Sequence, residues 1–151
     1  MSIVPTNVNY NSFLMRQNLV TLNRTYPFLN IQSVSSSVLG RDIFVVKLGR
    51  GQKKVFYSAS IHANEWITSV LLMKFIEDYA ISYQNNSDLY GYSVRNLFNS
   101  VSIYIMPMVN PDGVDLVTST LNISSSAYLN AQAIGNQFPD ISFPSRMESK
   151  Y

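Results

Sequence analysis

Hydrophobic and polar residues follow two different periods along the chain. Apolar residues recur with helical spacing over residues 9–24, and they are nearly continuous over Trp66–Ala80. These patterns predict an amphipathic helix and a largely buried helix. Ile31–Val38 and Ile43–Leu48 are strand-like and are separated by a turn at Gly40–Asp42, so they predict an antiparallel hairpin.

The remaining pattern adds two strands and a short helix. Lys54–Ile61 reads as a strand that leads directly into His62. Val101–Val109 is almost wholly apolar, which is typical of a strand covered on both faces, and a turn at Asn110–Gly113 ends it. Leu89–Phe98 suits a short helix. The order helix, strands, helix, strand predicts an α/β domain with a mixed sheet.

Composition and charge narrow the possible functions. The 151 residues suffice for one domain, and a hydrophobic share of 46% indicates a folded core. A net charge of +2, with scattered lysines and arginines, argues against nucleic acid as a partner. The absence of cysteine excludes disulfides and thiolate metal sites. No stretch approaches the roughly 18 apolar residues of a membrane span, and the N-terminus lacks the pattern of a signal peptide, which leaves a cytoplasmic location as the default.

The only histidine, His62, precedes Glu65 by three residues at the change from strand to helix. Histidine and glutamate are common ligands of catalytic zinc, and the carboxyl ends of strands are where α/β sheets bind ligands. On spacing alone the alternative stays open. His62 could be an ordinary hydrogen-bonded histidine, and Glu65 could be favoured by the dipole at a helix N-terminus.

Three segments in the same order resemble a known family. The stretch "SIHANEWIT" is similar to the H-A-x-E-W-I-T signature of the M14 zinc carboxypeptidases. "MPMVNPDGV" resembles the P-x-x-N-P-D-G turn of that family, and "SSSVLGRDIFVVKLG" resembles its S-x-x-G-R-x-I hairpin. The resemblance extends from Ser35 to about Pro144, so residues 1–151 are interpreted as part of an M14 catalytic domain.

The resemblance implies a three-layer α/β/α fold with a mixed central sheet, here truncated. It also implies zinc as the cofactor, with His62 and Glu65 as two of its three ligands. Asn64 stands where the digestive carboxypeptidases carry a substrate-binding arginine, and this makes Asn64 a candidate substrate contact. The form "HANEW" resembles the bacterial branch that cleaves γ-D-glutamyl-diamino acid bonds, so the implied substrate is a cell-wall peptide.

The resemblance also shows what is missing from the implied site. The family takes its third zinc ligand from a second histidine and its general base from a later glutamate, and this sequence has no second histidine. Neither Glu77 nor Glu148 matches the base, and Glu77 is expected at a solvent edge of its helix. We therefore expect no activity from this chain alone. The alternatives are a non-catalytic remnant with weak or no metal binding, and a zinc deacylase of the aspartoacylase type, against which "HANEW" and the N-P-D-G turn count.

Further expectations concern the tail, the sheet edge and single residues. Shifting the codons of Met147–Tyr151 by one base can give Trp-Lys-Ala-Asn-Ile, a continuation similar to the bacterial branch, so we hypothesise a frameshifted tail over residues 145–151. The strand Val101–Val109 is expected to lack its neighbours and to expose an apolar edge through which the chain self-associates. Five other residues are given structural roles: turn formation for Asp112 and Gly113, core packing for Trp66, and surface positions for Arg95 and Arg146.

Overall fold

The computed structural model describes residues 2–138, 143 and 144. Its elements are α1 (Ser12–Thr25), β1 (Asn30–Ser36), β2 (Asp42–Leu48), β3 (Lys53–Ser58), the 3-10 turn η1 (Ala63–Glu65), α2 (Trp66–Asn85), β4 (Asp88–Leu89), β5 (Tyr92–Ser93), α3 (Val94–Ser100), β6 (Val101–Met106), α4 (Pro111–Val117) and α5 (Ser126–Gly135). None of the helices in these residues is both long enough and apolar enough to cross a bilayer.

The main sheet has four strands in the order β1-β2-β6-β3. β1 and β2 form the expected antiparallel hairpin, β2 pairs antiparallel with β6, and β3 pairs parallel with β6. The expectation that the strand beginning at Val101 lacks its neighbours is wrong, because α2 carries the chain from β3 back to a parallel position beside β3. β6 is therefore an inner strand, and β1 and β3 are the edge strands of the sheet that the described residues form.

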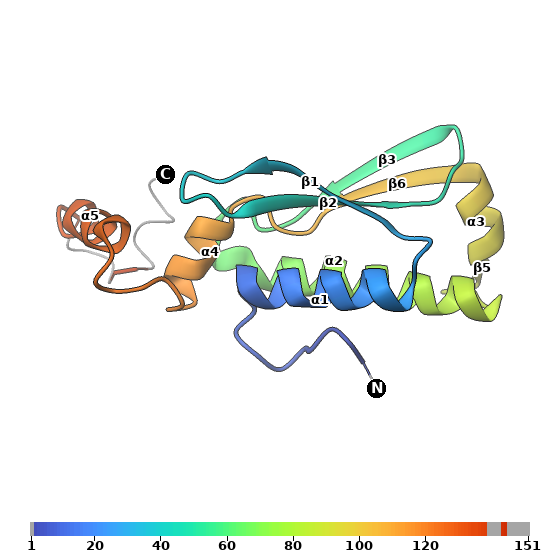
Figure 1. The fold of residues 1–151 in the computed structure, drawn as a ribbon, viewed down its shortest axis with the longest axis horizontal. Coiled ribbons are helices and arrows are strands. Elements are labelled where there is room, and N and C mark those ends of the chain that lie inside the picture. The colour runs from blue at the N-terminus through green and yellow to red at the C-terminus, as the bar shows by residue number, and fades with distance from the viewer. Residues whose placement is uncertain (1, 139–142, 145–151) are drawn as a thin grey trace.

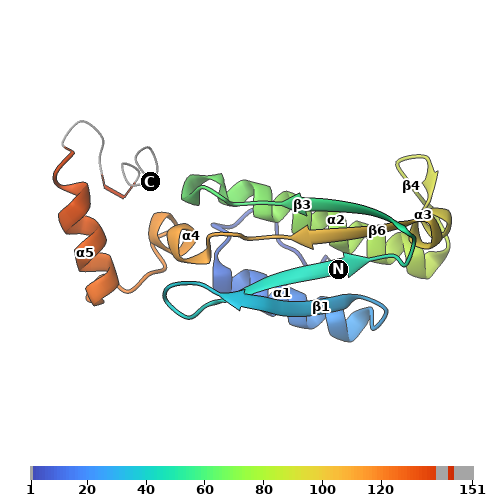
Figure 2. The ribbon, with the colours of Figure 1, turned by 90° about the horizontal axis from the view of Figure 1, so that it is seen from above.

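The helices α1 and α2 lie side by side beneath one face of this sheet (Figures 1 and 2). An α/β fold with a mixed sheet is confirmed, and the described residues supply two of the three layers that the resemblance implies. The core lies between the sheet and these two helices. It includes Val46 and Ile105, which are directly paired on the helix-facing side of the sheet, and Met73 and Ile76 of α2, all fully buried.

Several local structures follow from the sequence as expected, and three do not. The short helix expected over Leu89–Phe98 is α3, which begins only at Val94, because the strands β4 and β5 come before it. Asn11 caps α1 by accepting a hydrogen bond from the N–H of Leu14. Asn110 caps α4 in the same way through the N–H of Gly113, so the N-P-D-G segment begins a helix rather than forming an isolated turn. Proline at the first helical position suits this role, because its missing N–H has no partner there anyway. α5, in a stretch of weak periodicity, was not expected.

The turn between β2 and β3 packs directly on the start of β6. A Cβ placed on Gly51 would lie 1.9 Å from the carbonyl carbon of Ser100 and 2.1 Å from the backbone nitrogen of Val101. Because both neighbours are backbone atoms, no side-chain rotation can make room. Glycine at this position is therefore needed for β3 to reach β6.

Candidate metal site

His62 and Glu65 lie just beyond the carboxyl ends of the two parallel strands β3 and β6. The segment after β3 is held by the segment after β6, since the N–H of Val109 donates to the carbonyl oxygen of Ala59 over 2.9 Å, and the N–H of Asn110 donates to that of Ser60 over 3.0 Å. The sequence placed His62 at the end of a strand, and the structure places it four residues beyond the end of β3. The site thus lies where α/β sheets bind ligands.

Ser60 gives this loop its shape. Its backbone is left-handed, with φ of 50°, an uncommon conformation for a residue that has a side chain. Three contacts hold it in place: its N–H donates to Thr68 Oγ1 over 3.0 Å, and its hydroxyl lies 3.2 Å from the carbonyl oxygen of Glu65 and 2.6 Å from Ser69 Oγ. These contacts fix the loop against the start of α2. They thereby set the position of Glu65, the residue before the first residue of that helix.

The side chains of His62 and Glu65 converge. His62 Nδ1 lies 3.1 Å from Glu65 Oε1, and the two side chains are 57% and 46% exposed. The pKa of Glu65 is lowered, chiefly by the hydrogen bond from His62. Two ligands about 2.0–2.2 Å from a tetrahedral zinc ion lie roughly 3.4 Å apart, so the observed separation fits two corners of such a site.

The donor set is incomplete within residues 2–138, 143 and 144. No group of three histidine, cysteine, aspartate or glutamate side chains is close enough together there to hold a metal ion. Asn64 lies between the two donors in the sequence and is exposed. The pair therefore fits zinc as part of a ligand set, and the described residues do not complete that set.

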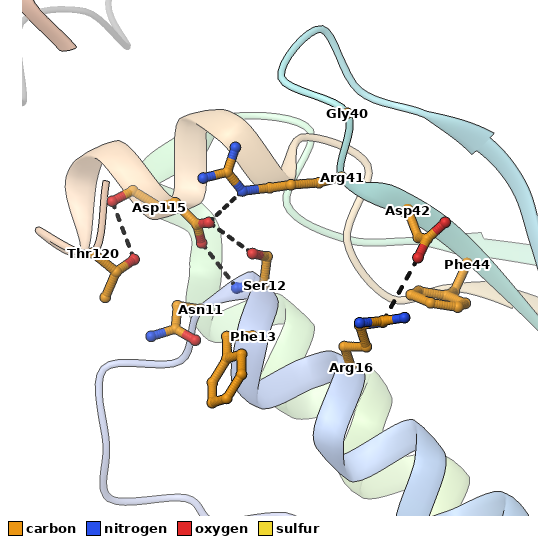
Figure 3. Close-up of a pocket in the computed structure, with 10 residues that line it drawn as sticks. All are labelled: Asn11, Ser12, Phe13, Arg16, Gly40, Arg41, Asp42, Phe44, Asp115 and Thr120. Atoms are coloured by element: carbon orange, nitrogen blue, oxygen red, sulfur yellow. Dashed lines mark hydrogen bonds and ion pairs between the residues drawn. The ribbon is translucent and has the colours of Figure 1, made fainter. Parts of the chain in front are cut away.

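The hairpin and the N-P-D-G segment are joined by an arginine. Arg41, the residue before β2, donates through Nε to Asp115 over 2.6 Å and through Nη1 to Asp112 over 2.8 Å. Asp115 also accepts from the N–H and the hydroxyl of Ser12, which ties the start of α1 to the same point (Figure 3). The hollow of about 440 Å³ beside these groups contains neither His62 nor Glu65.

α4 in turn supports the loop that carries His62. A Cβ on Gly113 would lie 2.9 Å from Ala63 Cβ and 2.5 Å from Asn110 Nδ2, so only glycine allows α4 to approach η1 this closely. The three sequence segments that resemble the M14 family are thus in one chain of contacts: hairpin to α4 through Arg41, and α4 to the His62 loop through Gly113. Asp112 has a structural role, but as an ion-pair partner of Arg41 rather than as a turn former.

Glu77 has a different place from the one expected. Its side chain is 1% exposed, not at a solvent edge, because it binds the N-terminal segment. It accepts hydrogen bonds from the N–H groups of Ile3 and Val4, from the hydroxyl of Ser2 and from Lys74 Nζ. Burial raises its pKa, but these hydrogen bonds outweigh burial and leave the pKa below its ordinary value. Glu77 therefore has a structural role, which is to hold the N-terminal segment, and it takes no part in the His62 loop.

The other residues singled out from the sequence have the expected structural settings where the structure describes them. Trp66 is partly buried against the core. Arg95 is exposed and lies over the ring of Tyr83, 5.1 Å from its centroid. Arg146, Glu148 and the tail over residues 145–151 lie outside the described residues. Sequence reasoning missed Arg41, Asp115 and Ser12 as a supporting group, and no local pattern marks them, because their contacts join segments more than 70 residues apart.

Two solved structures share this fold. A structure of bovine thrombin-activatable fibrinolysis inhibitor in complex with tick carboxypeptidase inhibitor aligns with a TM-score of 0.60 and 23% identity, over 72% of this chain and 33% of that chain. Another structure of thrombin-activatable fibrinolysis inhibitor gives a TM-score of 0.65 and 21% identity, over 78% and 30% of the two chains. These likenesses show the fold.

The sequence identifies the family. The zinc carboxypeptidase model matches residues 15–138, so the chain belongs to the M14 zinc carboxypeptidase family. It is 40% identical over 109 residues to gamma-D-glutamyl-L-diamino acid endopeptidase 1 of Lysinibacillus sphaericus, covering 72% of this chain and 28% of that protein. It is 31% identical over 96 residues to human carboxypeptidase A6, covering 61% and 21%. The chain thus spans less than a third of these relatives.

Proposed function

We propose that His62 and Glu65 are two ligands of a catalytic zinc ion in a peptidase that acts on γ-D-glutamyl-diamino acid bonds of cell-wall peptides. The observation that carries this proposal is the convergence of His62 Nδ1 and Glu65 Oε1, 3.1 Å apart and exposed to solvent. The similarity to the endopeptidase of Lysinibacillus sphaericus supports the substrate class.

The residues of this chain have distinct parts in the proposed site. Zinc, when bound, would polarise the scissile carbonyl and lower the pKa of a bound water molecule towards 7. His62 and Glu65 would hold the ion, and Ser60 and Gly113 would keep the loop in position for it. Asn64 is exposed beside both donors and is proposed to contact the substrate. The third ligand and the general base would come from outside the described residues, so the chain by itself is proposed to be inactive.

A second candidate is a remnant that folds without binding metal usefully. It is favoured by the lack of a third donor beside His62 among the described residues, together with the single histidine of the sequence. In this case His62 and Glu65 are only a hydrogen-bonded pair at the surface. The two candidates differ in one measurable property, which is the zinc affinity of the chain.

Zinc titration of the metal-free chain against a chromophoric chelator separates the two candidates. The peptidase proposal predicts one zinc ion per chain, with the dissociation constant raised more than about tenfold by His62→Ala and by Glu65→Gln. Asp88→Asn, an exposed carboxylate in β4 away from the site, serves as the matched control and is expected to leave the affinity unchanged.

Two results would count against the proposed site. Zinc bound with equal affinity by wild type and His62→Ala would place the metal elsewhere, and no zinc binding would support the remnant. Activity is tested separately with a γ-D-glutamyl-diaminopimelate peptide. We expect no hydrolysis by this chain, and hydrolysis that survives Glu65→Gln would contradict the proposed role of that residue.

A further inference from the structure

His62 and Glu65 both stand at positions where a side chain commonly caps a helix. Glu65 is the residue before α2, and His62 is the residue before η1. Capping side chains accept hydrogen bonds from the free N–H groups of the first turn. Neither His62 nor Glu65 forms such a bond, so both side chains are free to converge on each other. The backbone that carries them is held by other residues.

Hydroxyl groups hold the backbone of Glu65. Thr68 Oγ1 donates to the carbonyl oxygen of Glu65 over 2.7 Å and accepts from the N–H of Ser60 over 3.0 Å. Ser60 Oγ donates to the same carbonyl oxygen over 3.2 Å. Ser60 and Thr68 thus form a closed ring of hydrogen bonds with that oxygen. The N–H of Glu65 donates to the carbonyl oxygen of His62 over 3.3 Å, so the position of one donor residue is tied to that of the other.

Ser69 supports this ring from the core. Its hydroxyl lies 2.6 Å from Ser60 Oγ, and the residues Ser69 and Ser60 are 0% and 1% exposed. A serine hydroxyl carries one proton, and Ser60 donates its proton to the carbonyl oxygen of Glu65. Ser69 is therefore the donor between the two serines. Loss of this donor would leave the accepting side of a buried hydroxyl unpaired, which is unfavourable.

The same contacts hold Ser60 in a backbone conformation that favours glycine. Its φ of 50° lies in the left-handed region, where the Cβ of any other residue is crowded. Residues persist in such conformations when the surrounding structure holds them there. Here the surrounding groups include the two hydroxyls of α2, at Thr68 and Ser69. Serine at position 60 is strained, and it supplies a hydroxyl to Glu65 that glycine would not.

We propose that Thr68 and Ser69 are positioning residues, whose hydroxyls act through Ser60 to hold His62 and Glu65 in place as a pair of metal donors. This inference rests on the proposed function of the pair. The work is divided: the two donor side chains stay free for the metal ion, and the hydroxyls at the start of α2 fix the backbone that carries them. Groups that orient metal ligands typically change metal affinity by about 10- to 100-fold. Because these hydroxyls act on the backbone, we expect the lower end of that range.

NMR relaxation of the backbone amides in the metal-free chain tests this positioning. We expect order parameters of about 0.85 at His62 and Glu65 in wild type, typical of a rigid backbone, and about 0.6 in Thr68→Val. Valine has nearly the shape of threonine but lacks its hydroxyl. Thr68→Ser retains the hydroxyl and should restore the wild-type values. Thr68 is only partly buried, so both variants are expected to fold, and urea unfolding checks this.

Ser69→Ala is compared with Ser102→Ala, a matched control at the start of β6. Ser102 is 2% exposed and donates to the carbonyl oxygen of Gly51 over 2.7 Å, so each variant removes a buried, hydrogen-bonded hydroxyl. Their urea midpoints should fall by similar amounts. Only Ser69→Ala should lower the order parameters of the His62 loop and raise the dissociation constant for zinc, by about tenfold. Ser60→Gly removes the strain together with the hydroxyl, so it should loosen the loop without a comparable fall in the urea midpoint.

Three outcomes would overturn the proposal. Order parameters of about 0.6 at His62 and Glu65 in wild type would show that the pair is not held. Wild-type values in both Thr68→Val and Ser69→Ala would show that the hydroxyls do not hold it. An equal loss of zinc affinity in Ser69→Ala and Ser102→Ala would reduce the effect to general stability. A wild-type chain that binds no zinc would contradict the proposed function instead, and the order parameters decide the positioning without metal.

Discussion

Arg41→Ala is expected to destabilise the whole domain, because this side chain joins the hairpin to α4. Its guanidinium donates to Asp115 over 2.6 Å and to Asp112 over 2.8 Å. The side chains of Arg41, Asp112 and Asp115 are 26%, 18% and 7% exposed, so solvent screens these pairs only in part. Their loss should therefore be measurable, unlike that of a surface ion pair.

The size of the effect follows from the groups left behind. A hydrogen bond to a charged group contributes about 1.5–3 kcal/mol, and removing one partner of a buried pair costs about 3–5 kcal/mol. Asp115 keeps the N–H and hydroxyl of Ser12 as donors, and Asp112 keeps the hydroxyl of Ser37 and the N–H of Leu39. These contacts reduce the loss, so we expect the free energy of unfolding to fall by about 3 kcal/mol, with the larger share from Asp115.

Urea unfolding followed by circular dichroism, at one fixed protein concentration, measures this change. Double-mutant cycles with Asp115→Asn and Asp112→Asn should give coupling energies to Arg41 of about 2 and about 1 kcal/mol. Arg24→Ala, an exposed arginine in the last turn of α1, is the control and should cost less than about 0.5 kcal/mol. A loss for Arg41→Ala no greater than that of the control would refute the reasoning.

Two further substitutions test other parts of the structure. Gly51→Ala should lower the free energy of unfolding by more than about 3 kcal/mol, because its Cβ would overlap the backbone of Ser100. The Cβ of Gly40→Ala meets no atom, so this control should cost only about 1 kcal/mol, for its positive φ. Equal losses of the two variants in urea unfolding would be evidence against the close approach of Gly51 to Ser100. Glu77→Gln should cost about 2–3 kcal/mol at pH 7 and also remove part of the acid sensitivity. Since the folded pKa of Glu77 lies below its ordinary 4.5, its ionised form stabilises the fold fully above that pH, and this contribution is lost as the pH falls through the folded pKa. If the free energies of unfolding of wild type and Glu77→Gln differ by the same amount at every pH from 7 to 3, this assignment is contradicted.

The sequence predicted the elements whose patterns are local. The hairpin, the two long helices and the position of His62 after a strand follow from periodicity and turn residues. The amphipathic pattern over residues 9–24 predicted α1 within three residues at its start. These features depend on residues close together in the chain, which is why they can be read from it.

The features that the sequence did not predict depend on contacts between distant parts of the chain. Glu77 looked like a surface residue of its helix, but the N-terminal segment 75 residues away covers it and supplies its donors. The neighbours of β6 could not be assigned because pairing is decided by how α2 returns the chain across the sheet. α5 lies in a stretch rich in polar residues where the helix is begun by a cap, Ser125, rather than by a hydrophobic pattern. The zinc assignment of His62 and Glu65 stays a prediction.

The contacts that join Arg41, α4 and the His62 loop bear on how such chains evolve. Arg41 and Gly113 belong to the segments by which this family is recognised, and they hold these segments together, so a mutation in either would damage folding even in a chain that has no catalysis to lose. Selection for a folded, protease-resistant product would therefore preserve this part of the signature after the enzyme itself had gone. In this family, an intact motif is evidence of an intact scaffold first and of a working enzyme only when the third donor is found.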